Sequence, residues 1–255
     1  MTIDIRNKRI RVYSIQEKVM IEYSYDGDFL NRVHFDLPDD TFGYPTTMRV
    51  LANKCYFFYT SMSGLSDPYY WVITDTCGQS LEIKQKHGQP VLKRGYACGT
   101  YCTSSSDNSL LYYNLFNDTI FRFTEQGVMP AFLWEQGKHR ISVSTEDISN
   151  DMMVFTMFAE TKRFLFFKWI DAGFKSFSSF GFYDKKMQIS MGTKKLRDDL
   201  NTQITIPLNW VFSYSQKDYM IGKIEPYELP EEILQRENID PEGNLVMIMI
   251  RLKDE

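Results

Sequence analysis

The sequence predicts an all-β fold of antiparallel strands, and three observations support this. Aromatic residues make up 15% of the 255 residues, with 19 phenylalanines and 16 tyrosines, and such side chains suit the half-buried surface of a sheet. The apolar residues come in short, often alternating runs of strand length. Glycine, aspartate, asparagine or serine separates these runs, as expected for turns between strands.

The predicted strands follow one another as hairpins along the chain. The first hairpin covers residues 9–35 and turns at Asp26-Gly27, because glycine accepts a positive φ at almost no steric cost. A second glycine turn is expected at Gln126-Gly127. The later groups, in chain order, combine residues 54–61 with 68–83, 109–114 with 119–135, 152–170 with 174–191, and 208–224 with 244–253.

One short helix is expected within residues 226–238. Pro230 can occupy its first turn, and Glu231 and Glu232 would lie favourably near the positive end of the helix dipole.

The hairpin unit recurs at a spacing of roughly 40–60 residues, which is the size of a β-propeller blade. This even spacing favours a propeller over a sandwich or a barrel. The sequence therefore predicts one β-propeller domain over residues 1–255, built of four-stranded antiparallel blades. About five blades are expected, and whether the propeller is complete stays open.

Composition and charge exclude several function classes. The net charge is −4, and no basic stripe is present, so nucleic acid is not an expected partner. No apolar run reaches the roughly 18–20 residues that span a bilayer, and no apolar signal-peptide core is visible at the start. The four cysteines are interpreted as free thiols, because their spacing fits neither a redox motif nor a zinc site.

Three groups of residues are candidates for ligand binding, and each has a structural alternative. Asn117, Asp118 and Thr119 would offer a carboxylate and a hydroxyl at a rim, although turn chemistry is the favoured explanation. Asp198 and Asp199 could contribute to a calcium site, but no complete oxygen-ligand loop accompanies them, so a solvated turn is favoured.

Tyr70 and Trp71 form the third candidate group. Their flat faces would suit a sugar or a peptide, whereas burial between blades is the favoured explanation. No catalytic residue, metal ion or cofactor is assigned, because each histidine is isolated and no phosphate-binding glycine loop occurs.

Three stretches of the sequence resemble a six-bladed, NHL-like β-propeller family of Gram-negative bacterial envelope proteins. The first is 109–137, where the matching residues are Tyr113, Asn114, Asn117, Asp118, Thr119, Ile120 and Pro130. The second is 194–210, with Asp198, Asp199 and Pro207, although Asn201-Thr202-Gln203 replaces the usual glycine pair. The third is 233–253, with Glu237, Asn238 and Pro241.

The resemblance implies a propeller in the periplasm or at the cell surface, here without the usual leader and about one blade. It implies no established reaction, because one fold serves both enzymes and binding proteins. We expect a non-catalytic binding or scaffold propeller whose partner is an unknown protein, peptide or glycan.

Two alternatives stay open at this stage. The chain could be a hydrolase or lyase with a metal or acid–base site at the channel mouth. Convergence of two or more of His34, His87, His139, Asp118 and Asp198 would favour that enzyme. It could also be a degenerate fragment, which would unfold without cooperativity.

Overall fold

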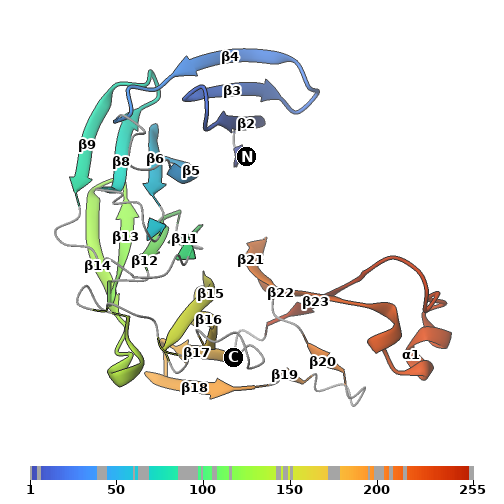
Figure 1. Ribbon diagram of the computed structural model, residues 1–255. Coiled ribbons are helices and arrows are strands. Elements are labelled where there is room, and N and C mark those ends of the chain that lie inside the picture. The colour runs from blue at the N-terminus through green and yellow to red at the C-terminus, as the bar shows by residue number, and fades with distance from the viewer. Residues whose placement is uncertain are drawn as a thin grey trace. The chain divides into compact units, whose positions relative to one another are not determined.

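The computed structural model shows a chain of antiparallel sheets (Figure 1). It describes residues 2–4, 7–38, 45–59, 61–62, 69–85, 97–98, 100–104, 108–114, 117–141, 145, 149, 152–171, 179–194, 196–197, 204–206, 209–214 and 217–252. The backbone gathers into two compact units. The first comprises Met1–Cys102 and Asn108–Ser149, and the second comprises Thr103–Asp107 and Asn150–Glu255.

The first unit contains three four-stranded sheets in which strands follow one another in chain order. The first sheet consists of β1 (Thr2–Asp4), β2 (Arg9–Ser14), β3 (Val19–Ser24) and β4 (Phe29–His34). The second consists of β5 (Pro45–Leu51), β6 (Lys54–Tyr59), β8 (Tyr69–Asp75) and β9 (Ser80–Gln85). The third consists of β11 (Thr100–Ser104), β12 (Leu110–Asn114), β13 (Thr119–Thr124) and β14 (Gly127–Leu133).

Three further short elements are described in this unit. The strands β7 (Ser61–Met62) and β10 (Ala97–Cys98) pair with each other. The 3-10 helix η2 (Gly137–His139) follows β14.

The second unit contains a further four-stranded sheet and a three-stranded one. The four strands are β15 (Met153–Glu160), β16 (Phe164–Asp171), β17 (Ser179–Asp184) and β18 (Ile189–Thr193). The three strands are β21 (Trp210–Tyr214), β22 (Lys217–Ile224) and β23 (Val246–Arg251). A separate pair is formed by β19 (Leu196–Arg197) and β20 (Thr205–Ile206).

The predicted helix is present but shorter than the range 226–238 in which it was expected. It is α1 (Glu231–Arg236), and the 3-10 helix η3 (Pro226–Glu228) precedes it. Pro230 occupies the N-cap position, one residue before the first turn in which it was expected. Glu231 and Glu232 lie in its first turn, as expected. None of the helices in the described part of the chain is long and apolar enough to cross a bilayer.

The second sheet is buried on both faces, and this explains its apolar sequence. Successive side chains of a strand point to opposite faces. Cys55, Phe57 and Tyr59 of β6 pack with side chains of the first sheet, whereas Tyr56 and Phe58 pack with side chains of the third. A sheet of a two-layer sandwich keeps one face toward solvent, so burial on both faces requires three stacked sheets.

Apolar clusters of described residues fill spaces between sheets. The cluster between the first and second sheets contains Met20, Val33, Phe35, Leu37, Met48, Cys55, Phe57, Tyr59 and Val72. The cluster between the second and third contains Leu51, Tyr56, Phe58, Trp71, Ile73, Leu110, Tyr112 and Phe123. In the second unit, Phe166, Phe180, Ile206 and Met220 join β16 and β17 to β20 and β22.

The predicted fold class is confirmed. The chain is mostly β, four of its sheets are four-stranded antiparallel blades of the propeller type, and the described residues contain one short α-helix. No sheet in the described residues closes into a barrel. Four complete blades and the three-stranded sheet agree with the expected number of about five.

Local details differ from the sequence-based prediction. The turn between β13 and β14 is centred on Glu125 and Gln126, and Gly127 begins β14 instead of occupying the turn. The strands β1 and β5 were not predicted; the turn after β5 uses Ala52 and Asn53, both with positive φ. Asn-Gly or Asp-Gly is the usual signal for such a turn.

The two described cysteine side chains are free thiols, as expected. Cys55 is buried and Cys77 is exposed. Burial raises the pKa of the Cys55 thiol to about 12, so this thiol stays protonated and unreactive at neutral pH.

Candidate functional site

The turn between β12 and β13 carries the first predicted site residues. The Asn117 side-chain oxygen accepts a hydrogen bond from the Thr119 backbone N–H at 2.9 Å, and the Asn117 N–H donates to the carbonyl of Asn114 at 2.9 Å. This is the turn chemistry expected for Asn before a strand. Asn117 and Thr119 therefore shape the turn that presents Asp118.

Asp118 connects this turn to the segment that follows β14. Its carbonyl accepts a hydrogen bond from the Trp134 N–H at 2.8 Å. Its Oδ1 lies 2.8 Å from Arg140 Nε, and the Asp118 side chain is 26% exposed. This oxygen is shielded from solvent, and it lacks hydrogen-bond alignment with the guanidinium despite the ion-pair distance.

Gln136 adds a buried amide to the same segment. Its Nε2 donates to the hydroxyl of Tyr113 at 2.7 Å. Its Oε1 is buried and, among the residues that the structure describes, has no hydrogen-bond partner. Asp118 Oδ1 and Gln136 Oε1 are thus two buried acceptor oxygens on connected segments.

The structure describes three of the five residues proposed for an acid–base site, Asp118, His139 and His34. Asp118 pairs with Arg140, which directly follows His139 at the end of η2. His34 ends β4, in a different sheet. His87 and Asp198 lie outside the described residues.

Trp71 and Tyr70 lie on β8. Trp71 is only 2% exposed, and its ring packs against Tyr112, Phe121 and Phe123 of the third sheet. Its indole Nε1 donates to Glu82 Oε1 on the neighbouring strand at 3.0 Å.

Tyr70 is half-buried. Burial raises the pKa of its phenol, and its backbone carbonyl accepts a hydrogen bond from the Tyr112 hydroxyl at 3.4 Å. The remaining predicted site residues, Asp198 and Asp199, lie outside the described residues.

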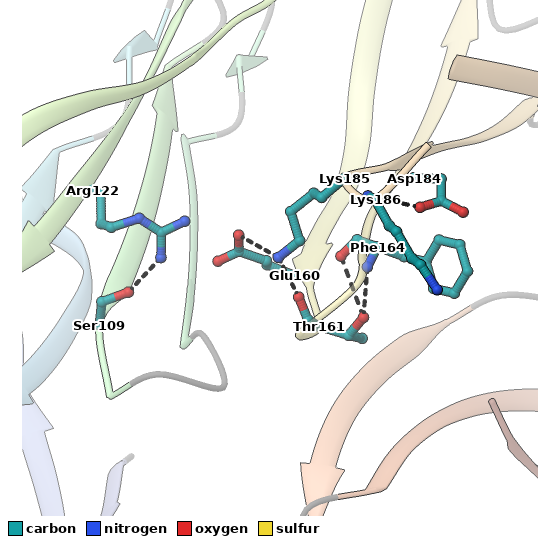
Figure 2. Close-up of polar contacts among 8 residues, drawn as sticks. All are labelled: Ser109, Arg122, Glu160, Thr161, Phe164, Asp184, Lys185 and Lys186. Carbon is teal, nitrogen blue, oxygen red and sulfur yellow. Dashed lines mark hydrogen bonds and ion pairs between the residues drawn. The ribbon is translucent and has the colours of Figure 1, made fainter. Parts of the chain in front are cut away.

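A second cluster of charged residues joins two hairpins of the β15–β18 sheet (Figure 2). Lys185 Nζ lies 3.0 Å from Glu160 Oε1 and donates to the carbonyl of Thr161 at 2.5 Å. Asp184 accepts two hydrogen bonds from Arg163, at 3.0 and 2.7 Å. Sequence reasoning missed this cluster, although cations occur in both turns, at 162–163 and 185–186.

The Glu160 and Asp184 carboxylates are almost fully buried, at 5% exposure each. The hydrogen bonds from Arg163 hold the pKa of Asp184 at about 2, well below its usual 3.8. Asp184 Oδ1 also accepts the backbone N–H groups of Lys186 and Met187, so it organises the β17–β18 turn. Both carboxylates are engaged in holding hairpins together.

A simpler polar contact supports the third sheet. Arg122 Nη1 donates to Ser109 Oγ at 2.7 Å, which connects β13 to the residue before β12 (Figure 2). Among the described residues, no group of three or more His, Cys, Asp or Glu side chains is arranged to hold a metal ion.

Comparison with models of protein families shows which family the chain belongs to. The model of the family described as Domain of unknown function (DUF4934) matches residues 1–251. The chain belongs to the DUF4934 family. No curated protein matches the sequence of this DUF4934 chain significantly.

Solved structures resemble the DUF4934 chain in fold. BF0058 of Bacteroides fragilis NCTC 9343, provisionally described as an exported protein, has a TM-score of 0.65 at 15% identity. The match covers 99% of this chain and 76% of BF0058. A DUF4221 member from Bacteroides vulgatus ATCC 8482 has a TM-score of 0.53 at 10% identity, and the match covers 96% of this chain and 76% of that protein.

A more distant structure is virginiamycin B lyase from Staphylococcus aureus. Its TM-score is 0.41 at 12% identity, with 86% of this chain and 75% of the lyase covered. This likeness is too distant to carry any statement about activity. The similarity to BF0058 and the DUF4221 protein concerns the fold of the DUF4934 chain alone.

Proposed function

We propose that this chain is a non-catalytic binding or scaffold propeller of the cell envelope, which contacts a glycan, a peptide or a partner protein. One observation carries the proposal. The exposed large apolar side chains of the described residues gather mainly on the last strand of each blade. They include Phe29 and Leu30 on β4, Leu81 and Ile83 on β9, Met129 and Leu133 on β14, Ile189 and Met191 on β18, and Met247 and Met249 on β23.

Single exposed apolar residues are common on protein surfaces, whereas rows of them on edge strands indicate contact surfaces. Here the exposure recurs at the same position in successive blades. Leu133 is 70% exposed and Met247 is 64% exposed, so these side chains contribute little to the cores between sheets. The outer strands therefore favour a binding or scaffolding role.

The Asp118 corner provides a second, polar contact point in this proposal. The Asp118 side chain is 26% exposed although its Oδ1 is buried, so its other oxygen, Oδ2, would accept a hydrogen bond from a ligand hydroxyl or amine.

Two measurements on the purified full chain test the binding role. Glycan and peptide arrays should show saturable binding to at least one class of molecule, and mass spectrometry should recover the bound molecule unchanged. A time-dependent mass change that disappears in Asp118→Asn would make the chain an enzyme and overturn the proposal. Absence of binding on both arrays would exclude the glycan and the peptide as its ligand and leave only the partner protein, and absence of any partner in a cross-linked pull-down with the full chain would then overturn the proposal.

The envelope location rests on the resemblance of the three sequence stretches and on the provisional description of BF0058 as exported. Fractionation of the source cells should find the chain outside the cytoplasm. Recovery in the cytoplasmic fraction, beside a cytoplasmic marker enzyme, would contradict this location.

A further inference from the structure

The strand β18 lies at one end of its sheet. The sheet order is β15-β16-β17-β18, and in the described part of the chain β18 pairs with β17 alone (Figure 1). One row of its backbone N–H and C=O groups therefore faces away from the sheet. Such a row is able to pair with an additional strand.

The side chains along this edge are apolar and exposed. Ile189 is 48% exposed and Met191 is 50% exposed, and both point to the same face because they are two residues apart. Met187, in the turn before the strand, is 58% exposed. The strand itself, from Ile189 to Thr193, has no charged residue.

Lysines lie at both ends of β18. Lys186 precedes it and Lys194 follows it, and both are exposed. Within the described residues, neither side chain has a carboxylate partner. Lys185 differs, because its ammonium is already paired with Glu160 (Figure 2).

Two acidic groups of the same sheet are already paired with cations. Asp184 is paired with Arg163, and Glu160 with Lys185. The outer strand β23 contrasts with β18, because Asp240 and Glu242 precede its exposed methionines. The two ends of β18 thus keep positive charge that an acidic partner would complement.

We propose that β18 docks an extended segment of a partner protein that has alternate apolar residues and acidic residues at both ends. This inference rests on the proposed binding function and specifies one partner class for it. The segment would pair with β18 as a fifth strand of the blade, place its apolar side chains on Ile189 and Met191, and direct its carboxylates to Lys186 and Lys194.

The length of β18 determines the length of the segment. Five strand residues extend over about 17 Å at roughly 3.3 Å per residue. A segment of about seven to nine residues would place acidic groups beyond both ends. A fluorescein-labelled nonapeptide, EEVTVTVEE, has this pattern and serves as the probe.

Fluorescence anisotropy with the full chain measures the binding. We expect saturable binding of EEVTVTVEE, and binding at least about tenfold weaker for KKVTVTVKK, whose charges are reversed. Rising salt should weaken the binding of the acidic probe because the lysines are exposed. In an added strand, alternate backbone N–H groups of the probe peptide face β18 and the others face away. N-methylation of the peptide at the first set of positions should therefore abolish binding, and N-methylation at the second set should not.

Matched variants locate the binding edge. Lys186→Glu with Lys194→Glu should weaken the acidic probe at least about tenfold, whereas Lys138→Glu with Lys217→Glu makes the same charge change elsewhere and should not. Ile189→Ser with Met191→Ser should also weaken binding, whereas Met247→Ser with Met249→Ser on β23 should not.

Three outcomes would overturn the inference. The first is that EEVTVTVEE does not bind. The second is that the two N-methylated peptides bind as tightly as the unmethylated peptide. The third is that the serine variants of β18 and of β23 weaken binding equally. None of these decides the proposed function, which the arrays test separately. Array binding that survives the β18 variants would leave a binding propeller with a different docking site.

Discussion

Asp184 shows how much one buried carboxylate can organise. It accepts two hydrogen bonds from Arg163 of the β15–β16 turn and two backbone N–H groups of its own turn. These four donors favour the ionised form and lower its pKa from 3.8 to about 2. The carboxylate therefore stabilises the fold only while it is ionised.

The pKa difference predicts an acid-dependent loss of stability. A carboxylate whose pKa is lower in the folded state stabilises the protein above its unfolded pKa, near 4, and loses this effect as the pH falls toward 2. Asp184→Asn should therefore lower the free energy of unfolding at pH 7. The difference between wild type and variant should shrink between pH 4 and pH 2.

Urea unfolding at several pH values measures this difference. The exposed turn residue Asp26 is the matched control, and Asp26→Asn should change the unfolding free energy little at any pH. A wild-type advantage over Asp184→Asn that stays constant down to pH 2 would contradict the assigned pKa.

At the scale of elements, the β8–β9 turn connects the first sheet to the second. The Asp36 N–H donates to the carbonyl of Gly78 at 2.9 Å, and the Ser80 hydroxyl donates to the carbonyl of Asp36 at 2.5 Å. Gly78 has a φ of +98°, and a Cβ on it would overlap the carbonyl of His34. Only glycine satisfies both requirements.

Gly78→Ala should destabilise the fold by about 2–4 kcal/mol, because left-handed backbone strain adds to overlap with neighbouring backbone. Gly27→Ala is the control, since Gly27 has a similar φ of +92° but no atom within 4 Å of the added Cβ. It should cost about 1–2 kcal/mol. Chemical denaturation measures both, and equal losses would mean that the contact with His34 is unimportant.

At the scale of the whole molecule, the sequence predicts one domain over residues 1–255, and the structure divides the chain into two compact units. We propose that the units unfold as one domain. Gly78 lies in the first unit and Gly181 in the second, where a Cβ on Gly181 would overlap the ring of Phe167.

Calorimetry of Gly78→Ala and Gly181→Ala tests this proposal. In a single domain, each substitution should lower the temperature of the same transition. Gly192→Ala is a control for Gly181→Ala, because Gly192 pairs with Gly181 but its added Cβ would have only ordinary contacts. The proposal would be contradicted by two separate thermal transitions, one lowered only by Gly78→Ala and the other only by Gly181→Ala.

The sequence alone determined most of the longer strands and the chemistry of several turns. Alternating runs and turn residues act through neighbours along the chain, so they indicated the β12–β13 turn at Asn117, the turn at Gly27 and the helix after Pro230. The strand β5 and its Ala52-Asn53 turn were missed, because these residue types give no strong local signal.

Only the tertiary structure decided which faces and charges meet. Tyr56 and Phe57 look equivalent in sequence, yet they pack toward different sheets. The pairs Asp118–Arg140 and Glu160–Lys185 join residues 22 and 25 positions apart. Such contacts depend on how sheets stack and hairpins end, which is a property of the folded chain as a whole and not of any local pattern.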